Sequence, residues 1–187
     1  MENIASTLKV NRPHQITRVV VRAKIIVWCI AFLCAVVATV PAHASAEDAV
    51  KAAFLYNFAK LTTWPSGSGP IVVGVIGSSS AGDMISAVCN GKDAGGRTLV
   101  VKHITSSEAR SCQVVFVCAP DGASAAASAR SAAVLTVGES PGFAGSGGCI
   151  GFVLESGRVR FEINKANVRK AHLELDGKLL NLGKIVG

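Results

Sequence analysis

A continuous run of apolar residues in the middle of the chain constrains the fold more than any other segment. It occupies residues 113–120 and reads QVVFVCAP. A strand without polar alternation has to be covered on both faces, which is typical of central strands in parallel sheets flanked by helices. Three further runs of the same kind predict neighbouring strands: PIVVGVIG (70–77), TLVVKHI (98–104) and AVLTVGE (133–139).

Helical segments separate these runs and complete a strand–helix alternation. Residues 81–90 and 122–132 carry the helical patterns, and the second consists almost entirely of small side chains that can lie close to a sheet. Such alternation indicates an α/β fold. We therefore expect a single-domain sandwich with a mixed, largely parallel sheet flanked by helices and a C-terminal antiparallel hairpin.

The hairpin is predicted after residue 139, where the pattern changes. A glycine-rich loop without a helix leads to two apolar runs, 149–156 and 158–164, around a tight turn at Gly157. A short helix at 165–171 should follow. The remaining residues to 186 predict a last strand, an Asp-Gly turn and a short terminal helix.

The first 44 residues are predicted to be a secretory signal peptide. Residues 25–40 contain no charge, three basic residues stand between 18 and 24, and Ala42-His43-Ala44 is an A-x-A cleavage site. The apolar run is shorter than the roughly 20 residues that a membrane span needs. We expect export to the periplasm and cleavage after Ala44, with an uncleaved N-terminal anchor as the alternative. The mature domain would be residues 45–187.

The charge of the mature domain is mild. Residues 45–187 hold 14 Lys/Arg and 11 Asp/Glu, a net charge of +3 that is spread along the chain. A basic patch is the mark of a nucleic-acid binder, and none is evident. We therefore expect no nucleic-acid partner.

The segment after the predicted cleavage site reads as a helix to about Lys60. Ser45 and Asp48 have the spacing of a capping box, and Pro65 ends the segment. An apolar stripe at helical spacing predicts the face that packs on the sheet, while Lys51 and Leu55 should point elsewhere. The predicted stripe consists of Val50, Phe54, Phe58 and Leu61.

Four cysteines remain in the mature domain: Cys89, Cys112, Cys118 and Cys149. An even number in an oxidising compartment predicts two disulfides, with three possible pairings. No C-x-x-C is present, and no His stands at metal-ligand spacing from a Cys, so a structural zinc site is the less favoured alternative.

The expected topology suggests the pairing. The helix of the first βα unit returns to the end of the sheet where parallel strands begin, which places Cys89 near Cys112. Cys118 closes its strand at the opposite end, and a loop without a helix should feed the next strand from that same end. This reasoning predicts the disulfides Cys89–Cys112 and Cys118–Cys149.

The motifs of common enzyme families are absent from the sequence. There is no complete dinucleotide fingerprint, no P-loop, no G-x-S-x-G and no H-E-x-x-H. His103 and His172 each stand at a predicted strand end without a neighbouring nucleophile, and general acid–base catalysis would require a hydrogen-bonded partner. We expect no enzyme activity, no catalytic residue, no cofactor and no metal.

Candidate binding residues lie at the two ends of the mature domain. Tyr56 and Trp64 fall off the apolar stripe, and aromatics with a polar tip are favoured at interfaces. In the hairpin, strand alternation puts Phe161 and Ile163 on one face. The opposite face, with the helix and strand that follow, gives the other candidates: Arg160, Glu162, Asn164, Arg169 and His172.

The ordered set of segments resembles YfiR-like periplasmic proteins. Along the chain it comprises AVKAAFLYNFAKLTTWP, IVVGVIG, SCQVVFV, VLTVGE, GGCIGFV, RVRFEIN and KLLNLGKIV, which together cover nearly all of residues 48–186.

The resemblance implies a regulatory protein. Such a protein represses an inner-membrane diguanylate cyclase by binding its periplasmic sensor region, which lowers cyclic-di-GMP and biofilm formation. It also implies a homodimer, disulfides that matter for folding, and release by an OmpA-like outer-membrane lipoprotein. The alternatives are a periplasmic small-molecule-binding sensor, with a pocket lined by Arg160, Arg169 or His172, and a secreted enzyme using Glu162 or His172.

Overall fold

The computed structural model describes residues 42–187 except 66, 119–121 and 130–131. The predicted signal peptide lies almost entirely outside the described residues. Within them, no helix has both the length and the apolar character needed to cross a membrane.

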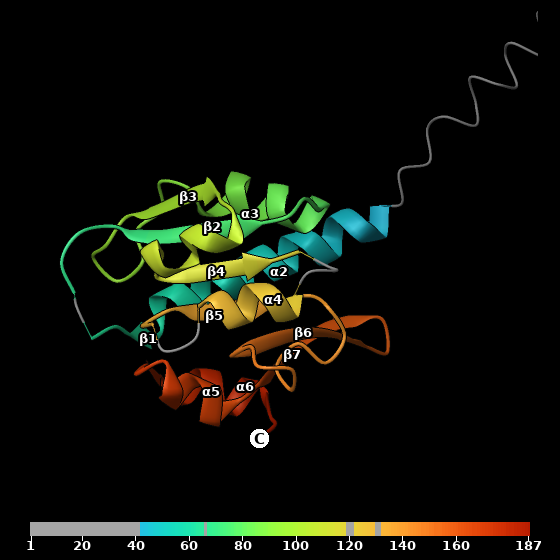
Figure 1. Ribbon diagram of the computed structural model, residues 1–187. Coiled ribbons are helices and arrows are strands. Elements are labelled where there is room, and N and C mark those ends of the chain that lie inside the picture. The colour runs from blue at the N-terminus through green and yellow to red at the C-terminus, as the bar shows by residue number, and fades with distance from the viewer. Residues whose placement is uncertain (1–41, 66, 119–121, 130–131) are drawn as a thin grey trace, which may run out of the picture. The chain divides into compact units, whose positions relative to one another are not determined.

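A seven-stranded sheet forms the centre of the domain, in the order β3-β2-β4-β5-β6-β7-β9 (Figure 1). The strands from β3 to β6 are mutually parallel, β7 is antiparallel to β6, and β9 runs parallel to β7. A separate antiparallel pair joins β1 to β8. The bounds are β1 Thr62–Thr63, β2 Ile71–Ile76, β3 Leu99–His103, β4 Val114–Val117, β5 Leu135–Gly138, β6 Ile150–Glu155, β7 Arg158–Ile163, β8 Glu174–Leu175 and β9 Lys184–Ile185.

Helices cover both faces of the sheet, so the predicted α/β sandwich with a mixed, largely parallel sheet is confirmed (Figure 1). One core lies under α2 (Ala42–Lys60) and α3 (Ser80–Cys89) and extends to residues of α5 (Lys165–Lys170) and α6 (Gly177–Leu182). The opposite core lies under the 3-10 helix η1 (Ser106–Ser111) and α4 (Gly122–Ser128). Every strand residue of β4 is buried, as its continuous apolar run predicts.

Three details of the prediction are wrong. The helix α2 begins at Ala42, so position 45 lies inside the helix and is not its N-cap. The Asp-Gly turn is instead the start of α6, where the Asp176 carboxylate accepts a hydrogen bond from the Lys178 backbone N–H at 2.8 Å. A final strand, β9, was not expected and extends the sheet beyond β7.

The apolar stripe of α2 is rotated relative to the prediction. Leu55 is fully buried with Phe58, whereas Val50 is 42% exposed. The buried residues of the helix are Asp48, Ala52, Leu55, Phe58 and Ala59, and the partly buried Phe54 and Leu61 pack against the same core, as predicted. The prediction considered large side chains alone, but the helix also buries two alanines and a carboxylate.

The strand β6, which follows the loop after β5, runs in the direction opposite to the predicted one. Val137 pairs with Ile150 in parallel register, so the loop carries the chain back across the sheet without a regular helix. Phe143 is the anchor of this crossover, with 3% of its surface exposed. Its ring occupies the space in which side chains at Gly138 and Gly148 would stand.

Replacing Gly148 by Ala is expected to lower the free energy of unfolding by about 1–3 kcal/mol, because a Cβ there would overlap the Phe143 ring. Urea unfolding would measure the change. Gly145→Ala is the matched control in the same loop, since its Cβ would meet only the Gly142 carbonyl oxygen at 3.4 Å. Equal stability of the two variants would show that Phe143 does not anchor the crossover.

Candidate functional site

Polar side chains gather at the carboxyl ends of the parallel strands. Glu139 follows β5, Cys118 follows β4, and Ser79 precedes α3 after β2. Open α/β sheets bind ligands outside this edge, because the loops there leave crevices between the strand ends. The first turns of α2 reach the same edge through Lys51, whose Nζ lies 2.9 Å from Oε2 of Glu139.

An ionic cluster of three residues is built at this edge. Lys51 Nζ lies 2.9 Å from Glu139 and 3.8 Å from Oδ1 of Asp48. The Lys51, Asp48 and Glu139 side chains are only 18%, 7% and 13% exposed, so their charges are weakly solvated. One ammonium therefore faces two carboxylates, and the cluster ties α2 to the end of β5.

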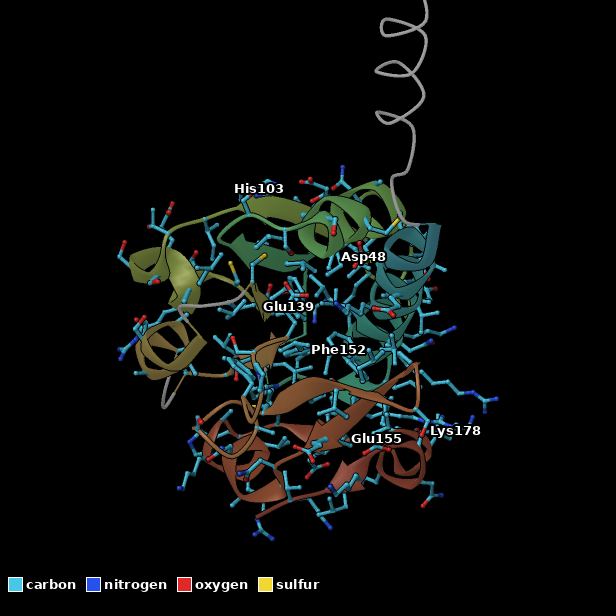
Figure 2. All side chains as sticks on the ribbon, turned by 90° about the vertical axis from the view of Figure 1, so that its right-hand side faces the viewer. Asp48, His103, Glu139, Phe152, Glu155 and Lys178 are labelled. Carbon is cyan, nitrogen blue, oxygen red and sulfur yellow. The ribbon has the colours of Figure 1, made fainter. Side chains whose placement is uncertain are left out.

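A small cavity adjoins the cluster, with a volume of about 100 Å³. Charged residues line one side, namely Glu47, Lys51 and Glu139, and apolar residues of the β6–β7 hairpin line the other, including Phe152, Leu154 and Val159. Figure 2 shows Asp48, Glu139 and Phe152 close together on the face turned toward the viewer. Drug-sized ligands occupy pockets of roughly 300–1,000 Å³, so this cavity accepts a much smaller group.

Cys118 supplies no nucleophile at this edge. Its thiol lies 3.2 Å from the Ser79 hydroxyl and is buried. Burial raises the pKa of the Cys118 thiol, and the negative charges of Glu139 and Asp83 act in the same direction. Because the thiolate is the reactive form, a neutral buried thiol is inert. The described residues also contain no group of three or more His, Cys, Asp or Glu that could hold a metal ion.

The two predicted aromatic contacts are both engaged within the domain. The Tyr56 hydroxyl donates a hydrogen bond to the Asp93 carbonyl at 2.7 Å, and the ammonium of Lys92 lies 5.7 Å from its ring centroid. Trp64 is half-buried against the core, and its indole N–H has no hydrogen-bond partner among the described residues. Each side chain therefore has a packing role.

The predicted residues near the hairpin divide into exposed and internal ones. Arg160, Arg169 and His172 are exposed, and Glu162 is partly exposed beside Lys184, whose Nζ lies 3.0 Å from its Oε1. Asn164 is buried, because its side chain caps α5 by accepting from the Asn167 backbone N–H and donates to the Ala144 carbonyl, both at 3.0 Å. The structure places Arg160 and Glu162 together on β7 but leaves Tyr56 on the other side of α2, toward the α3–β3 connection.

Sequence reasoning missed the ionic cluster. Lys51 was expected to point away from the sheet, and Asp48 was assigned to a cap. The available signal was Glu139, a carboxylate placed directly after the apolar strand run LTVG. Open α/β sheets bind ligands at the carboxyl ends of their strands, so a carboxylate at this position indicates a candidate site residue.

Both predicted disulfide pairings are wrong for this structure, in which all four cysteines are free thiols. Cys89 packs in the core under α2 and α3, whereas Cys112 packs in the core on the opposite face of the sheet. Cys118 lies beyond the β4–β5 pair Val117–Gly138, and the Cys149 N–H bonds to Thr136 near the other end of β5. Cys118 and Cys149 are therefore about 10 Å apart along the strands and two strands apart across the sheet, well beyond the reach of about 7 Å.

The buried thiols are expected to resist alkylation in the folded protein. Burial raises the pKa of Cys89 to about 11, so at pH 8 its thiolate is scarce. Since the folded pKa exceeds the ordinary value of 9.0, the protonated thiol is the stabilising form, and stability should fall as the pH rises from 9 toward 11.

Mass spectrometry after iodoacetamide treatment would check this expectation on the mature domain. We expect no label at pH 8 in the native state and four labels after unfolding without reductant. Fewer than four labels on the unfolded chain would reveal disulfides that this structure does not contain.

Comparisons with known proteins give a family and a fold. Residues 48–184 match the model of a family described as YfiR/HmsC-like. A comparison with curated proteins gives no match.

Two solved structures share the architecture. The crystal structure of the ABC domain in complex with L-Trp from Streptococcus pneumoniae is 10% identical, with a TM-score of 0.52. A conserved domain protein from Vibrio cholerae O1 biovar El Tor is 8% identical, with a TM-score of 0.53. Each match covers 75% of this chain and 60% of the other chain. At such identities the likeness concerns the fold alone.

Proposed function

This chain belongs to the YfiR/HmsC-like family, and from that premise we propose that it is a periplasmic repressor of an inner-membrane diguanylate cyclase. The repressor binds the periplasmic sensor region of the cyclase and thereby lowers cyclic-di-GMP and biofilm formation. The observation that carries the proposal is the family match, which spans residues 48–184 and so includes almost the whole described domain.

The proposed contact surface includes the exposed residues near the hairpin. Arg160, Arg169 and His172 are exposed, so a partner protein can contact them. Glu162 is partly exposed and forms an ion pair with the exposed Lys184. Charged groups of both signs favour specific recognition, because they penalise partners of the wrong charge pattern. The proposal also includes export with cleavage after Ala44, a homodimer, and release by an OmpA-like outer-membrane lipoprotein.

A second candidate function is small-molecule sensing in the periplasm. It is favoured by one observation, that a solved structure of the same fold is described as a complex with L-Trp. The cavity of about 100 Å³ is small for an amino acid of that size, which weighs against this candidate. A saturable thermal shift with free amino acids would support it.

Cellular cyclic-di-GMP in the native host tests the leading proposal. Deletion of the gene is expected to raise cyclic-di-GMP, and the exported protein should restore the original level. A form without residues 1–44 should fail to restore it, because it stays on the wrong side of the membrane from the sensor region. An unchanged level after deletion under several growth conditions would contradict repression.

A further inference from the structure

The cavity beside α2 opens between the first turns of that helix and the β6–β7 hairpin. We call it the α2 notch and define it by Glu47, Lys51, Glu139, Phe152, Leu154 and Val159. It is separate from the proposed contact residues, because Arg160 and Glu162 project from the face of β7 opposite Phe161, whose ring packs toward α2.

The rim of the α2 notch is apolar and exposed. Leu154 is 59% exposed and Val50 is 42% exposed, although both are large hydrophobic residues. Val50 follows Glu47 by three positions on α2, so its side chain neighbours that lining residue on the helix surface. Exposed apolar residues around a small pocket are typical of the ring that excludes water from the central contact of a protein interface.

The charge of the α2 notch is negative. Glu47 and Glu139 line it, Asp48 lies behind it, and Lys51 is the one cation among its lining residues. Lys51 is already held by Glu139 and Asp48 at 2.9 and 3.8 Å. The Glu47 carboxylate makes no hydrogen bond or ion pair with any other described residue, so it is available to an incoming cation.

Size and charge together indicate the occupant. A cavity of about 100 Å³ is smaller than the roughly 150 Å³ cavity that holds benzene, and it suits the end of one side chain. Arg and Lys combine an aliphatic stem, which packs on apolar surface, with a cationic head that seeks carboxylates. The stem would lie on Phe152, Leu154 and Val159, and the head would meet Glu47 and Glu139.

We propose that the α2 notch receives one Arg or Lys side chain of a partner protein, with Val50 and Leu154 covered by the apolar surroundings of that side chain. The proposal rests on the proposed function only for the identity of the partner, which is then the periplasmic region of the cyclase. It adds a docking surface that the family match does not assign.

The first test uses n-butylguanidinium as the probe and methyl NMR of the mature domain as the readout. We expect saturable shifts of the Leu154 and Val159 methyl signals with n-butylguanidinium and none with n-butanesulfonate. Glu47→Lys should abolish the shifts. Glu174→Lys should retain them, because Glu174 pairs with Thr63 beyond the far end of α2, and that end lies about 20 Å along the helix from Glu47. No saturable shift, or equal shifts with the sulfonate, would overturn the proposal.

The second test uses a photo-crosslinking amino acid at position 154 of the exported protein in the native host. We expect a crosslink to a cyclase peptide that contains Arg or Lys. Glu47→Lys should weaken binding about 30-fold, as loss of a central charged contact does, and Glu174→Lys should leave the crosslink unchanged. If the Glu47→Lys variant gave the same crosslinking yield as the protein that retains Glu47, the proposal would be overturned.

The outcomes separate the docking surface from the proposed function. If gene deletion raises cyclic-di-GMP while Glu47→Lys still represses fully, repression stands and the notch is not its docking surface. If n-butylguanidinium binds and position 154 crosslinks to another protein while deletion changes nothing, the notch stands and the cyclase proposal fails.

Discussion

Replacing Phe58 by Ala is expected to lower the free energy of unfolding by about 3–5 kcal/mol, the usual cost of removing a fully buried aromatic side chain. Phe58 is 0% exposed, and its ring centroid lies 4.9 Å from that of Phe161 and 5.8 Å from that of Phe152. The ring thus joins α2 to both strands of the hairpin. Urea unfolding followed by circular dichroism would measure the loss, with the slope of the transition checked for a change in cooperativity.

Val50→Ala is the matched control on the same helix. Val50 is 42% exposed, so its truncation should change the unfolding free energy by no more than about 0.5 kcal/mol. A large loss for Val50→Ala with a small loss for Leu55→Ala would restore the stripe expected from the sequence and would contradict the observed rotation of α2.

Lys51→Ala is expected to lower the free energy of unfolding by about 2–3 kcal/mol. The substitution leaves the poorly solvated carboxylates of Asp48 and Glu139 without their cation, and a broken buried pair costs more than the pair itself contributes. This loss is smaller than the loss expected on breaking a fully buried ion pair, because the Lys51 side chain is 18% exposed. Urea unfolding at pH 7 would measure it.

A second variant separates the lost charge from the lost packing. Lys51→Met keeps most of the side-chain volume, so in combination with Glu139→Gln it should recover much of the stability that Lys51→Ala loses. Equal instability of Lys51→Met alone and of the double variant would show that Glu139 does not need the ammonium. In that case the cluster would not fasten α2 to the end of β5.

The fold could be predicted from the sequence where the pattern is local. The run at 113–120 requires cover on both faces, and the structure buries all four residues of β4. The alternation of the β7 segment placed Phe161 inside and Arg160 outside, as observed. These features depend on the periodicity of one segment, so no knowledge of its neighbours is needed.

The candidate site could not be predicted in the same way. Lys51 and Glu139 are 88 positions apart, and only the packing of α2 across the sheet brings them to 2.9 Å. The buried face of α2 was predicted only in part, because Phe54 and Phe58 pack on the core as expected but Leu55 is buried there while Val50 is exposed. Which face a helix buries depends on the surface that receives it, here the rings of Phe152 and Phe161.

The cysteines also show which features follow from the sequence and which depend on tertiary structure. Their number and the predicted export were readable in the sequence, but their pairing depended on the direction of β6. The parallel register of β5 and β6, anchored by Phe143, places Cys118 and Cys149 at opposite ends of their strands. The sequence alone determined the strands, the α/β class and the family resemblance, because each follows from local pattern and order. Tertiary structure decided the strand direction, the buried face of α2 and the α2 notch, because these depend on contacts between segments distant in the chain.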